Sequence, residues 1–205
     1  MKLYQFDLSP NAKRVRVVAH EVGVPLAIVR LDPMKGEHTT AEYGAKNANH
    51  MVPTLELDDG TTLWESTAIC TYLAEIDPAK KLLPTDGRGR AEVARWIGWN
   101  AAHLEAALFT ILLEKMFART KLGREESELK VREAQRAVDR FAPVLNAHLE
   151  SQPHLAGAGF TIADVCIAAS IEIMAQTKLF EISSYRCIAA WLSRVQERAA
   201  WKAAS

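Results

Sequence analysis

A single proline constrains this chain strongly, because it stands directly before an alternating strand. The run is Met51-Val52-Pro53-Thr54-Leu55-Glu56-Leu57-Asp58-Asp59-Gly60, in which Leu55 and Leu57 share one face. Pro53 has no N–H for a strand ladder, so it predicts a strand start or an edge, often with a cis peptide bond in a tight turn. A cis Val52-Pro53 bond would leave the N–H and C=O of Val52 unpaired and able to receive an extended peptide.

The pair Glu65-Ser66 follows closely and opens the next predicted helix. The free N–H groups at the start of a helix suit a carboxylate. Together with Val52, this start predicts a pocket for a small zwitterionic peptide. The alternative is that Glu65-Ser66 is an ordinary N-terminal capping pair.

The first eighty residues alternate strands and helices. The predicted elements are a strand at Lys2–Phe6, a helix closed by Gly23 and Pro25, a strand at Ala27–Leu31, an irregular polar stretch at Asp32–Asn49, strands at Thr54–Leu57 and Thr61–Leu63, and a helix that ends before Pro78. The strand at Ala27–Leu31 is apolar apart from Arg30, which predicts a buried strand in a parallel pair. Asp58-Asp59-Gly60 is a hairpin signal. These residues predict an α/β domain over residues 1–79.

From about residue 89 the pattern is helical throughout. The predicted elements are a long run at Arg90–Arg119, a helix whose stripe includes Phe141 and which Pro143 should kink or end, a helix opened by Thr161-Ile162-Ala163-Asp164, and a last helix marked by Ile188, Trp191, Leu192 and Val195. Pro84 and two glycines predict a linker over residues 80–89. We therefore expect an all-helical domain over residues 90–205.

Composition excludes several classes of function. Lys plus Arg and Asp plus Glu both number 25, so bulk charge favours neither nucleic acid nor an anionic membrane. The start of the chain lacks an apolar core of signal-peptide length, and no apolar run reaches about 18 residues. The three cysteines form no CxxC pair, which is typical of a reducing compartment, so we expect a cytoplasmic protein. The histidines show no ligand spacing, and we expect no metal site.

Ser9 lies at the turn between the first strand and the first helix. A hydroxyl there, together with the helix N–H groups, can point at one atom of a bound ligand. If that atom is a thiol sulfur, both effects favour the thiolate. Lowering its pKa by ~2 units requires roughly 3 kcal/mol. The alternative is that Ser9 only caps the helix.

The ordered set of these motifs resembles the glutathione transferase family, specifically its serine-type phi and theta-like branches and their bacterial relatives. The motifs are Ser9 with Arg14-Val15, Lys35-Gly36-Glu37-His38, Asn47 before Val52-Pro53, Glu65-Ser66-Thr67-Ala68-Ile69 and Phe160-Thr161-Ile162-Ala163-Asp164. The resemblance covers essentially the whole chain. It implies a thioredoxin-like N-terminal domain, an all-helical C-terminal domain, glutathione as cosubstrate and a homodimer.

The resemblance also implies roles for single residues. Ser9 would hold and activate the glutathione sulfur, and the backbone of Val52, before Pro53, would pair with the cysteinyl part. Glu65 would attract the γ-glutamyl ammonium, and Ser66 would bind its carboxylate. His38 would reach the glycine carboxylate.

Two positions depart from the family pattern. Met51 stands where relatives often carry Lys or Gln, and a thioether binds a carboxylate poorly. His50 is a candidate to compensate, although it also reads as an ordinary loop histidine. Asn11, in Ser9-Pro10-Asn11, resembles a bacterial branch of glutathione-dependent disulfide reductases, in which this position helps to hold sulfur.

Other residues have weaker functional signals. Thr161 and Asp164 form a capping box, which we expect to support folding. The cysteines are expected to be buried and inert. By resemblance, Asn100, His103 and Phe109 on the long helix are candidates for lining a second-substrate pocket.

The sequence thus favours an enzyme that activates glutathione as thiolate for attack on a small hydrophobic electrophile. One alternative is a glutathione-dependent disulfide reductase. Another is a non-catalytic binding or scaffold protein with the same fold, since fold alone does not establish function.

Overall fold

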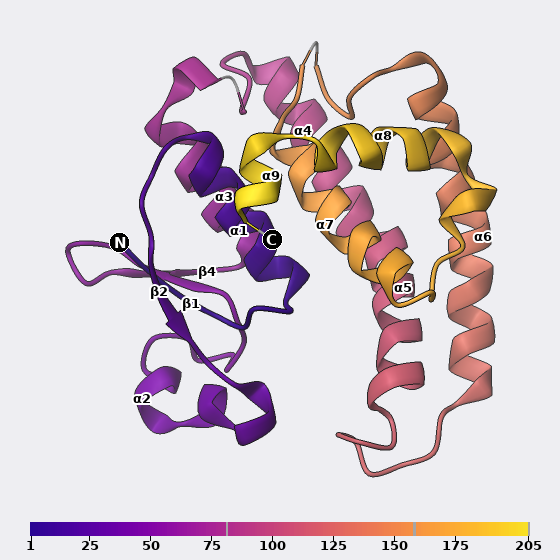
Figure 1. Ribbon diagram of the computed structural model, residues 1–205, viewed down its shortest axis with the longest axis horizontal. Coiled ribbons are helices and arrows are strands. Elements are labelled where there is room, and N and C mark those ends of the chain that lie inside the picture. Colours follow the sequence, from indigo (N-terminus) through magenta and orange to yellow (C-terminus); the bar gives the residue numbers. More distant parts are fainter. Residues whose placement is uncertain (81, 158, 205) are drawn as a thin grey trace. The chain divides into compact units, whose positions relative to one another are not determined.

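The computed structural model describes residues 1–80, 82–157 and 159–204. The chain forms two compact units, drawn in Figure 1. The first contains residues 1–85 and 196–205, and the second contains residues 86–195. The last ten residues of the chain therefore belong to the unit that contains the sheet.

The first unit is built on a four-stranded sheet with the order β2-β1-β3-β4. β1 (Lys2–Gln5) pairs in parallel with β2 (Ala27–Arg30) and antiparallel with β3 (Thr54–Glu56), which pairs antiparallel with β4 (Thr62–Trp64). The predicted parallel pair and the hairpin are confirmed. The predicted burial of the second strand is wrong: β2 is an edge strand, and its end residues Ala27 and Arg30 are exposed.

Two helices complete the core of this unit. α1 (Pro10–Glu21) packs against α3 (Ser66–Ile76), and the polar stretch between β2 and β3 contains two short 3₁₀ turns and α2 (Ala41–Gly44). Leu3 and Leu55 of the sheet and Val15 and Ile69 of the helices are fully buried. The apolar faces of α1, α3 and the sheet therefore share one core.

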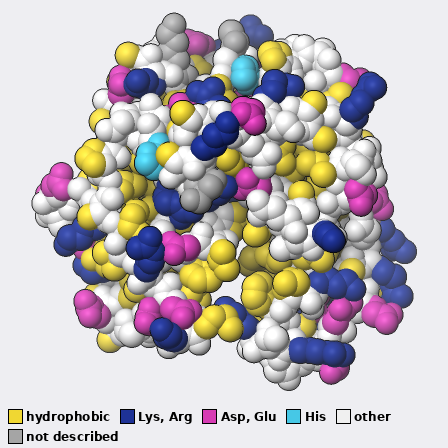
Figure 2. Space-filling model, viewed as in Figure 1, with side chains coloured by type: hydrophobic (Ala, Val, Ile, Leu, Met, Phe, Trp, Pro, Cys, Tyr) yellow, Lys and Arg dark blue, Asp and Glu magenta, His cyan; other side chains and the backbone are white. Residues whose placement is uncertain are grey.

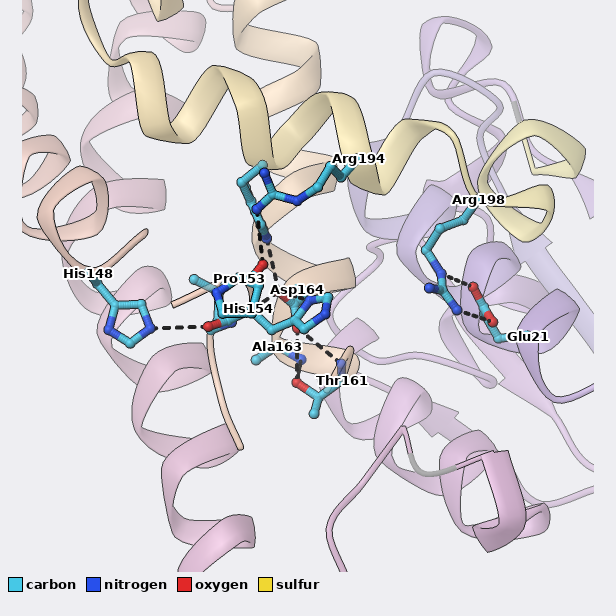
Figure 3. A network of polar contacts seen from close by, with 11 residues as sticks. Glu21, His148, Pro153, His154, Thr161, Ala163, Asp164, Arg194 and Arg198 are labelled. Atoms are coloured by element: carbon cyan, nitrogen blue, oxygen red, sulfur yellow. Dashed lines mark hydrogen bonds and ion pairs between the residues drawn. The ribbon is translucent and has the colours of Figure 1, made fainter. Parts of the chain in front are cut away.

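The end of the chain is fastened to α1 in the same unit. The short helix α9 (Ala199–Ala203) lies beside α1 (Figure 1). Just before α9, Arg198 makes a two-bonded ion pair with Glu21 at 2.6 and 2.9 Å (Figure 3). Trp201 is buried, and the ammonium of Lys13 lies 4.8 Å from its ring centroid.

The second unit is helical. Its first long helical run consists of α4 (Gly87–Trp99) and α5 (Glu105–Leu112), with π-helical turns at Asn100–Leu104 and Leu113–Phe117. Three further helices follow: α6 (Glu128–Ser151), α7 (Ile162–Gln176) and α8 (Arg186–Gln196). α6 does not end at Pro143, which lies inside it. The four apolar residues that predict the last long helix are all buried on α8.

The start of α7 is held by a buried carboxylate. Asp164 and Thr161 form the predicted capping box, and Asp164 is 0% exposed. Its Oδ2 accepts from the N–H of Thr161 at 3.0 Å, and its Oδ1 accepts from Leu155 N–H at 3.1 Å and from Trp191 Nε1–H at 2.9 Å (Figure 3 shows the surroundings). This one side chain therefore joins the start of α7, the preceding loop and α8, as the expected structural role requires.

The surface agrees with the balanced charge of the sequence. Acidic and basic side chains are interspersed on the face drawn in Figure 2. Of the helices that the structure describes, none combines the length and apolar character needed to cross a bilayer. Cys70 and Cys166 are buried as expected, whereas Cys187 is half-buried.

Candidate functional site

The loop that carries Met51, Val52 and Pro53 is fixed by a buried network of hydrogen bonds. The Val52-Pro53 peptide bond is cis, as the sequence predicts. The carbonyl of Met51 accepts from the hydroxyl of Tyr43 at 2.6 Å and from Asn47 Nδ2 at 2.8 Å. Thr54 Oγ1 lies 2.8 Å from the Tyr43 oxygen and 3.1 Å from Asn47 Nδ2.

The donor in each of these hydrogen bonds can be assigned from the chemistry of the groups. A carbonyl only accepts, so Tyr43 gives its proton to Met51, and Thr54 in turn donates to Tyr43 while accepting from Asn47. Burial raises the pKa of Tyr43, although the nearby polar groups of Thr54 and Asn47 oppose this effect, so the hydroxyl keeps its proton. Tyr43, Asn47 and Thr54 are all at most 3% exposed. The loop is therefore held by satisfied buried groups.

Val52 is left available by this arrangement. Within the described part of the chain, neither its N–H nor its C=O has a hydrogen-bond partner, whereas the carbonyl of Met51 next to it accepts two bonds. The side chain of Met51 points to solvent, with 63% of its area exposed. An extended peptide could pair with the backbone of Val52 as an added strand does.

The start of α3 is also open to a ligand. Glu65 adopts a positive φ of 68° and makes no capping hydrogen bond to the helix, and its side chain is exposed. A non-glycine residue in this region is strained, and such strain concentrates at ligand sites. Ser66 is buried, and its Oγ accepts from Arg14 Nη1 at 3.4 Å. A guanidinium, a hydroxyl and a helix N-terminus therefore meet at one point, which suits a carboxylate.

Ser9 does cap α1, and it keeps a proton to donate. Its Oγ accepts from the N–H of Ala12 at 3.3 Å. Accepting that bond leaves the hydroxyl hydrogen free for a further acceptor, so capping and sulfur binding are compatible roles. The residue is half-buried. Neither the N–H nor the side-chain amide of nearby Asn11 has a partner among the residues described.

The two candidate histidines lie together. His50 Nδ1 donates to the carbonyl of His38 at 3.0 Å, and its ring rests against Gly44, where an added Cβ would come within 2.6 Å of it. Because Nδ1 carries the hydrogen, Nε2 of a neutral His50 is an acceptor and offers no hydrogen bond to a carboxylate. His50 thus positions the segment at His38.

The three candidates in the helical unit have different surroundings. Asn100 is buried and donates from Nδ2 to Glu105 Oε2 at 2.7 Å. His103 is exposed and stacks on Phe141, with ring centroids 4.6 Å apart. Phe109 is 50% exposed. Of the three, Phe109 and His103 present surface to solvent, and Asn100 does not.

Comparisons with known proteins give the family. Residues 8–76 match the N-terminal domain of glutathione S-transferase, and residues 100–199 match its C-terminal domain. The chain is 31% identical over 194 residues to glutathione S-transferase D7 of Drosophila melanogaster, an alignment that covers 94% of this chain and 82% of the relative. The chain belongs to the glutathione S-transferase family.

Other glutathione S-transferases resemble it to a similar degree. A probable glutathione S-transferase of Oryza sativa, GSTF2, is 30% identical over 97% of this chain and 92% of its own length. Gtt2 of Saccharomyces cerevisiae superposes with a TM-score of 0.89 at 25% identity, over all of both chains. Glutathione S-transferase-I, solved with the ligand lactoylglutathione, has a TM-score of 0.84 at 27% identity, over 99% of this chain and 97% of that one.

These matches define the fold as that of a glutathione S-transferase, with a thioredoxin-like N-terminal sheet domain and an all-helical C-terminal domain. In the part of the chain that the structure describes, no group of three or more His, Cys, Asp or Glu side chains could hold a metal ion.

The sequence alone did not identify Arg14 and Tyr43 as site residues. Arg14 contacts Ser66 from another helix, and Tyr43 reaches Met51 across a loop. The sequence does contain a signal for Arg14, because an arginine on the apolar face of a short amphipathic helix must have a buried partner.

Proposed function

We propose that this protein is a glutathione transferase, which binds glutathione on its first unit and delivers the thiolate to a small hydrophobic electrophile. The observation that carries the proposal is the unpaired backbone of Val52, held in place by Tyr43 and Asn47, on the same unit as the open start of α3. Family membership supports the choice of glutathione as the peptide.

Charge complementarity orients the peptide. The γ-glutamyl end carries both an ammonium and a carboxylate. The exposed carboxylate of Glu65 suits the ammonium, and Ser66 with Arg14 suits the carboxylate. The cysteinyl unit then pairs with Val52, before Pro53, and the thiol is directed to Ser9.

The glycine end has the weakest binding groups. His38 supplies its side chain there, but Met51 offers no strong hydrogen bond, and neutral His50 presents an acceptor at Nε2. We propose that the γ-glutamyl and cysteinyl parts supply most of the affinity.

Ser9 stabilises the reactive form of sulfur. Its hydroxyl donates to the thiolate, and the N-terminus of α1 adds a favourable partial charge. The thiol proton passes to solvent. The sulfur then forms a bond to the electrophilic carbon while the leaving group departs with its electron pair. Positioning and a lowered sulfur pKa are the protein's contributions.

The electrophile and the quaternary structure are further parts of the proposal. By family membership we propose Phe109, His103 and Asn100 of the helical unit as candidates to contact the hydrophobic substrate; Phe109 and His103 are exposed, and Asn100 is buried. A homodimer is expected by family membership, and sedimentation velocity would measure it.

The test is the Ser9→Ala variant, assayed with glutathione and 1-chloro-2,4-dinitrobenzene. A lost hydrogen bond to a charged group amounts to about 1.5–3 kcal/mol, so turnover should fall about 10- to 100-fold while glutathione affinity by calorimetry stays nearly constant. Unchanged turnover would move the role to Asn11. Absence of glutathione binding to the unmodified protein would favour the scaffold function instead.

One observation favours a second function, glutathione-dependent disulfide reduction. The amide and N–H of Asn11 have no partner among the described residues, so they are available to hold a sulfur atom. Hydroxyethyl disulfide assayed beside the aryl halide separates the two. Strong reduction with negligible conjugation, lost in Asn11→Ala, would make reduction the function.

A further inference from the structure

Two histidine side chains of the first unit each leave one ring nitrogen accessible. Nδ1 of His38 is buried, and Nδ1 of His50 bonds to the backbone carbonyl of His38 at 3.0 Å. In both rings, Nε2 is accessible and has no hydrogen-bond partner among the described residues. The His50–His38 bond joins the 3₁₀ turn at Glu37–Thr39 to the residues just before Val52. The two accessible nitrogens therefore belong to segments that are held together.

The ring of His50 is fixed from two sides. His50 has a positive φ of 54°, a region that histidine enters more readily than most residues. Gly44 leaves room for the ring, because an added Cβ there would come within 2.6 Å of Cε1 and 3.2 Å of Nε2. On the other side, the carbonyl of His38 only accepts, so Nδ1 of His50 carries the hydrogen. Nε2 of neutral His50 is therefore an acceptor.

His38 has the opposite arrangement of its ring hydrogen. Its Nδ1 is buried and has no partner among the residues described. An N–H group buried without an acceptor loses its bonds to water and gains none, so we assign the hydrogen to the accessible Nε2. His38 thus offers a hydrogen-bond donor, whereas His50 offers an acceptor.

The surrounding segment offers no uncommitted positive charge to a carboxylate. Residues 27–50 are all described, and each Lys or Arg among them has a carboxylate partner. The pairs are Arg30 with Asp7 at 2.9 Å, Lys35 with Asp32 at 3.9 Å and Lys46 with Glu56 at 2.5 Å. The next side chain, that of Met51, is 63% exposed and uncharged.

A neutral donor beside a neutral acceptor suits one terminal group better than another. A carboxylate presents only acceptor atoms, whereas a primary carboxamide presents a C=O acceptor and N–H donors. Nε2–H of His38 can donate to either group. The lone pair on Nε2 of His50 can pair only with an amide N–H. The two histidines are therefore complementary to an amide.

We propose that the glycine end of this site prefers a C-terminal carboxamide to a carboxylate, so that the favoured cosubstrate is a γ-glutamyl-cysteinyl-glycine peptide with an amide end. The amide oxygen accepts from His38, and the amide nitrogen donates to His50. This inference rests on the proposed function, because it names the cosubstrate class of the same glutathione site.

The test compares three peptides by isothermal calorimetry at about pH 8, where an ordinary imidazole is neutral. They are reduced glutathione, its glycine carboxamide and its glycine methyl ester, which is uncharged at that end like the amide but has no terminal N–H. One added hydrogen bond between neutral groups gives a preference of about two- to tenfold. We expect the amide to bind more tightly than both the acid and the ester by that factor.

Three variants locate the preference. Asn tolerates a positive φ, so His50→Asn keeps the backbone but removes Nε2, and the amide should lose its advantage. His20→Asn, at an exposed histidine of α1, is the matched control and should keep it. Met51→Lys adds a cation at an exposed position, so it should strengthen binding of the acid about two- to fivefold and leave that of the amide within about twofold.

The outcomes separate this inference from the proposed function. If the unmodified protein binds the acid as tightly as the amide, or more tightly, this inference is wrong and the proposed function stands. Equal binding of the amide and the ester, or an amide preference that survives in His50→Asn, would remove the role of His50. If none of the three peptides binds, the proposed function fails, and this inference fails with it.

Discussion

The hydroxyl of Tyr43 donates a hydrogen bond of 2.6 Å to the backbone carbonyl of Met51. This bond joins the end of α2 to the residue before Val52, and its donor is itself held by Thr54. A backbone group that must pair with a ligand is useful only if the chain on either side of it is fixed. The Tyr43–Met51 bond is therefore a positioning contact for Val52.

Replacing Tyr43 with Phe should weaken glutathione binding more than it slows turnover. Loss of the hydroxyl leaves the Met51 carbonyl with one partner, Asn47, and should destabilise the fold by about 1–2 kcal/mol. We expect KM for glutathione to rise about five- to tenfold with kcat changed less than about twofold, measured by steady-state kinetics.

Tyr4→Phe is the matched control. The Tyr4 ring lies 5.9 Å from that of Tyr43, and its hydroxyl donates to Glu56 at 2.9 Å rather than to the loop. It should lose similar stability and keep its KM. Equal changes in KM for the two variants would contradict the positioning role.

Ser66→Ala should impair recognition of the γ-glutamyl end alone. If Ser66 and Arg14 bind its carboxylate, the variant should bind glutathione about tenfold more weakly, and the dipeptide Cys-Gly, which lacks that end, equally well. Calorimetry with both peptides measures this. Thr71→Ala, on the same helix with its hydroxyl bonded to the Thr67 carbonyl, should change neither affinity. A parallel loss of both peptides would indicate general damage to the site.

Asp164→Ala should destabilise the protein without changing its ligand affinity. The substitution leaves the buried donors of Leu155, Thr161 and Trp191 without an acceptor, each at a penalty of about 1–3 kcal/mol, so we expect a loss of at least about 3 kcal/mol in urea unfolding. Asp139→Ala, which removes an exposed carboxylate bonded to Gln135, should lose less than about 0.5 kcal/mol. A selective loss of glutathione affinity in folded Asp164→Ala protein would contradict the structural role.

Glu114 should make stability depend on acid pH. It is 4% exposed and accepts two hydrogen bonds of 2.6 Å from Arg124 and one of 2.9 Å from the N–H of Ser127. The Arg124 bonds, followed by that of Ser127, lower the pKa of Glu114 from its ordinary 4.5 to about 2. A carboxyl with a lowered folded pKa stabilises the protein fully above its unfolded pKa and loses that effect as pH falls toward the folded pKa.

The measurement compares urea unfolding of the unmodified protein and Glu114→Gln. The difference between their free energies of unfolding should be constant above about pH 5 and should shrink as pH falls from about 4.5 toward 2, because only the first protein loses a charge there. Thr120→Ala, a nearby change without a titratable group, should give a difference that does not vary with pH. A constant difference for Glu114→Gln would show that its charge contributes nothing.

Local signals account for the parts of the fold that were predictable. The turn at Asp58-Asp59-Gly60, the cap at Ser9 and the box at Thr161 and Asp164 each depend on residues a few positions apart, and all of them form. The edge position of β2 was not predictable in this way, because a short apolar run looks the same at the edge of a sheet and at its centre.

The order of motifs in the sequence determined the family, the two-part architecture and the proline turn beside Val52, because each motif acts through neighbours in the chain. Only the tertiary structure brought Arg14 to Ser66, Tyr43 to Met51, and Trp191 to Asp164, over sequence separations of 52, 8 and 27 residues. It also placed the ring of His50 against Gly44 and beside the carbonyl of His38. Such contacts depend on how packed elements meet in space, and hydrophobic periodicity specifies which face of a helix is buried but not which polar group it will meet there.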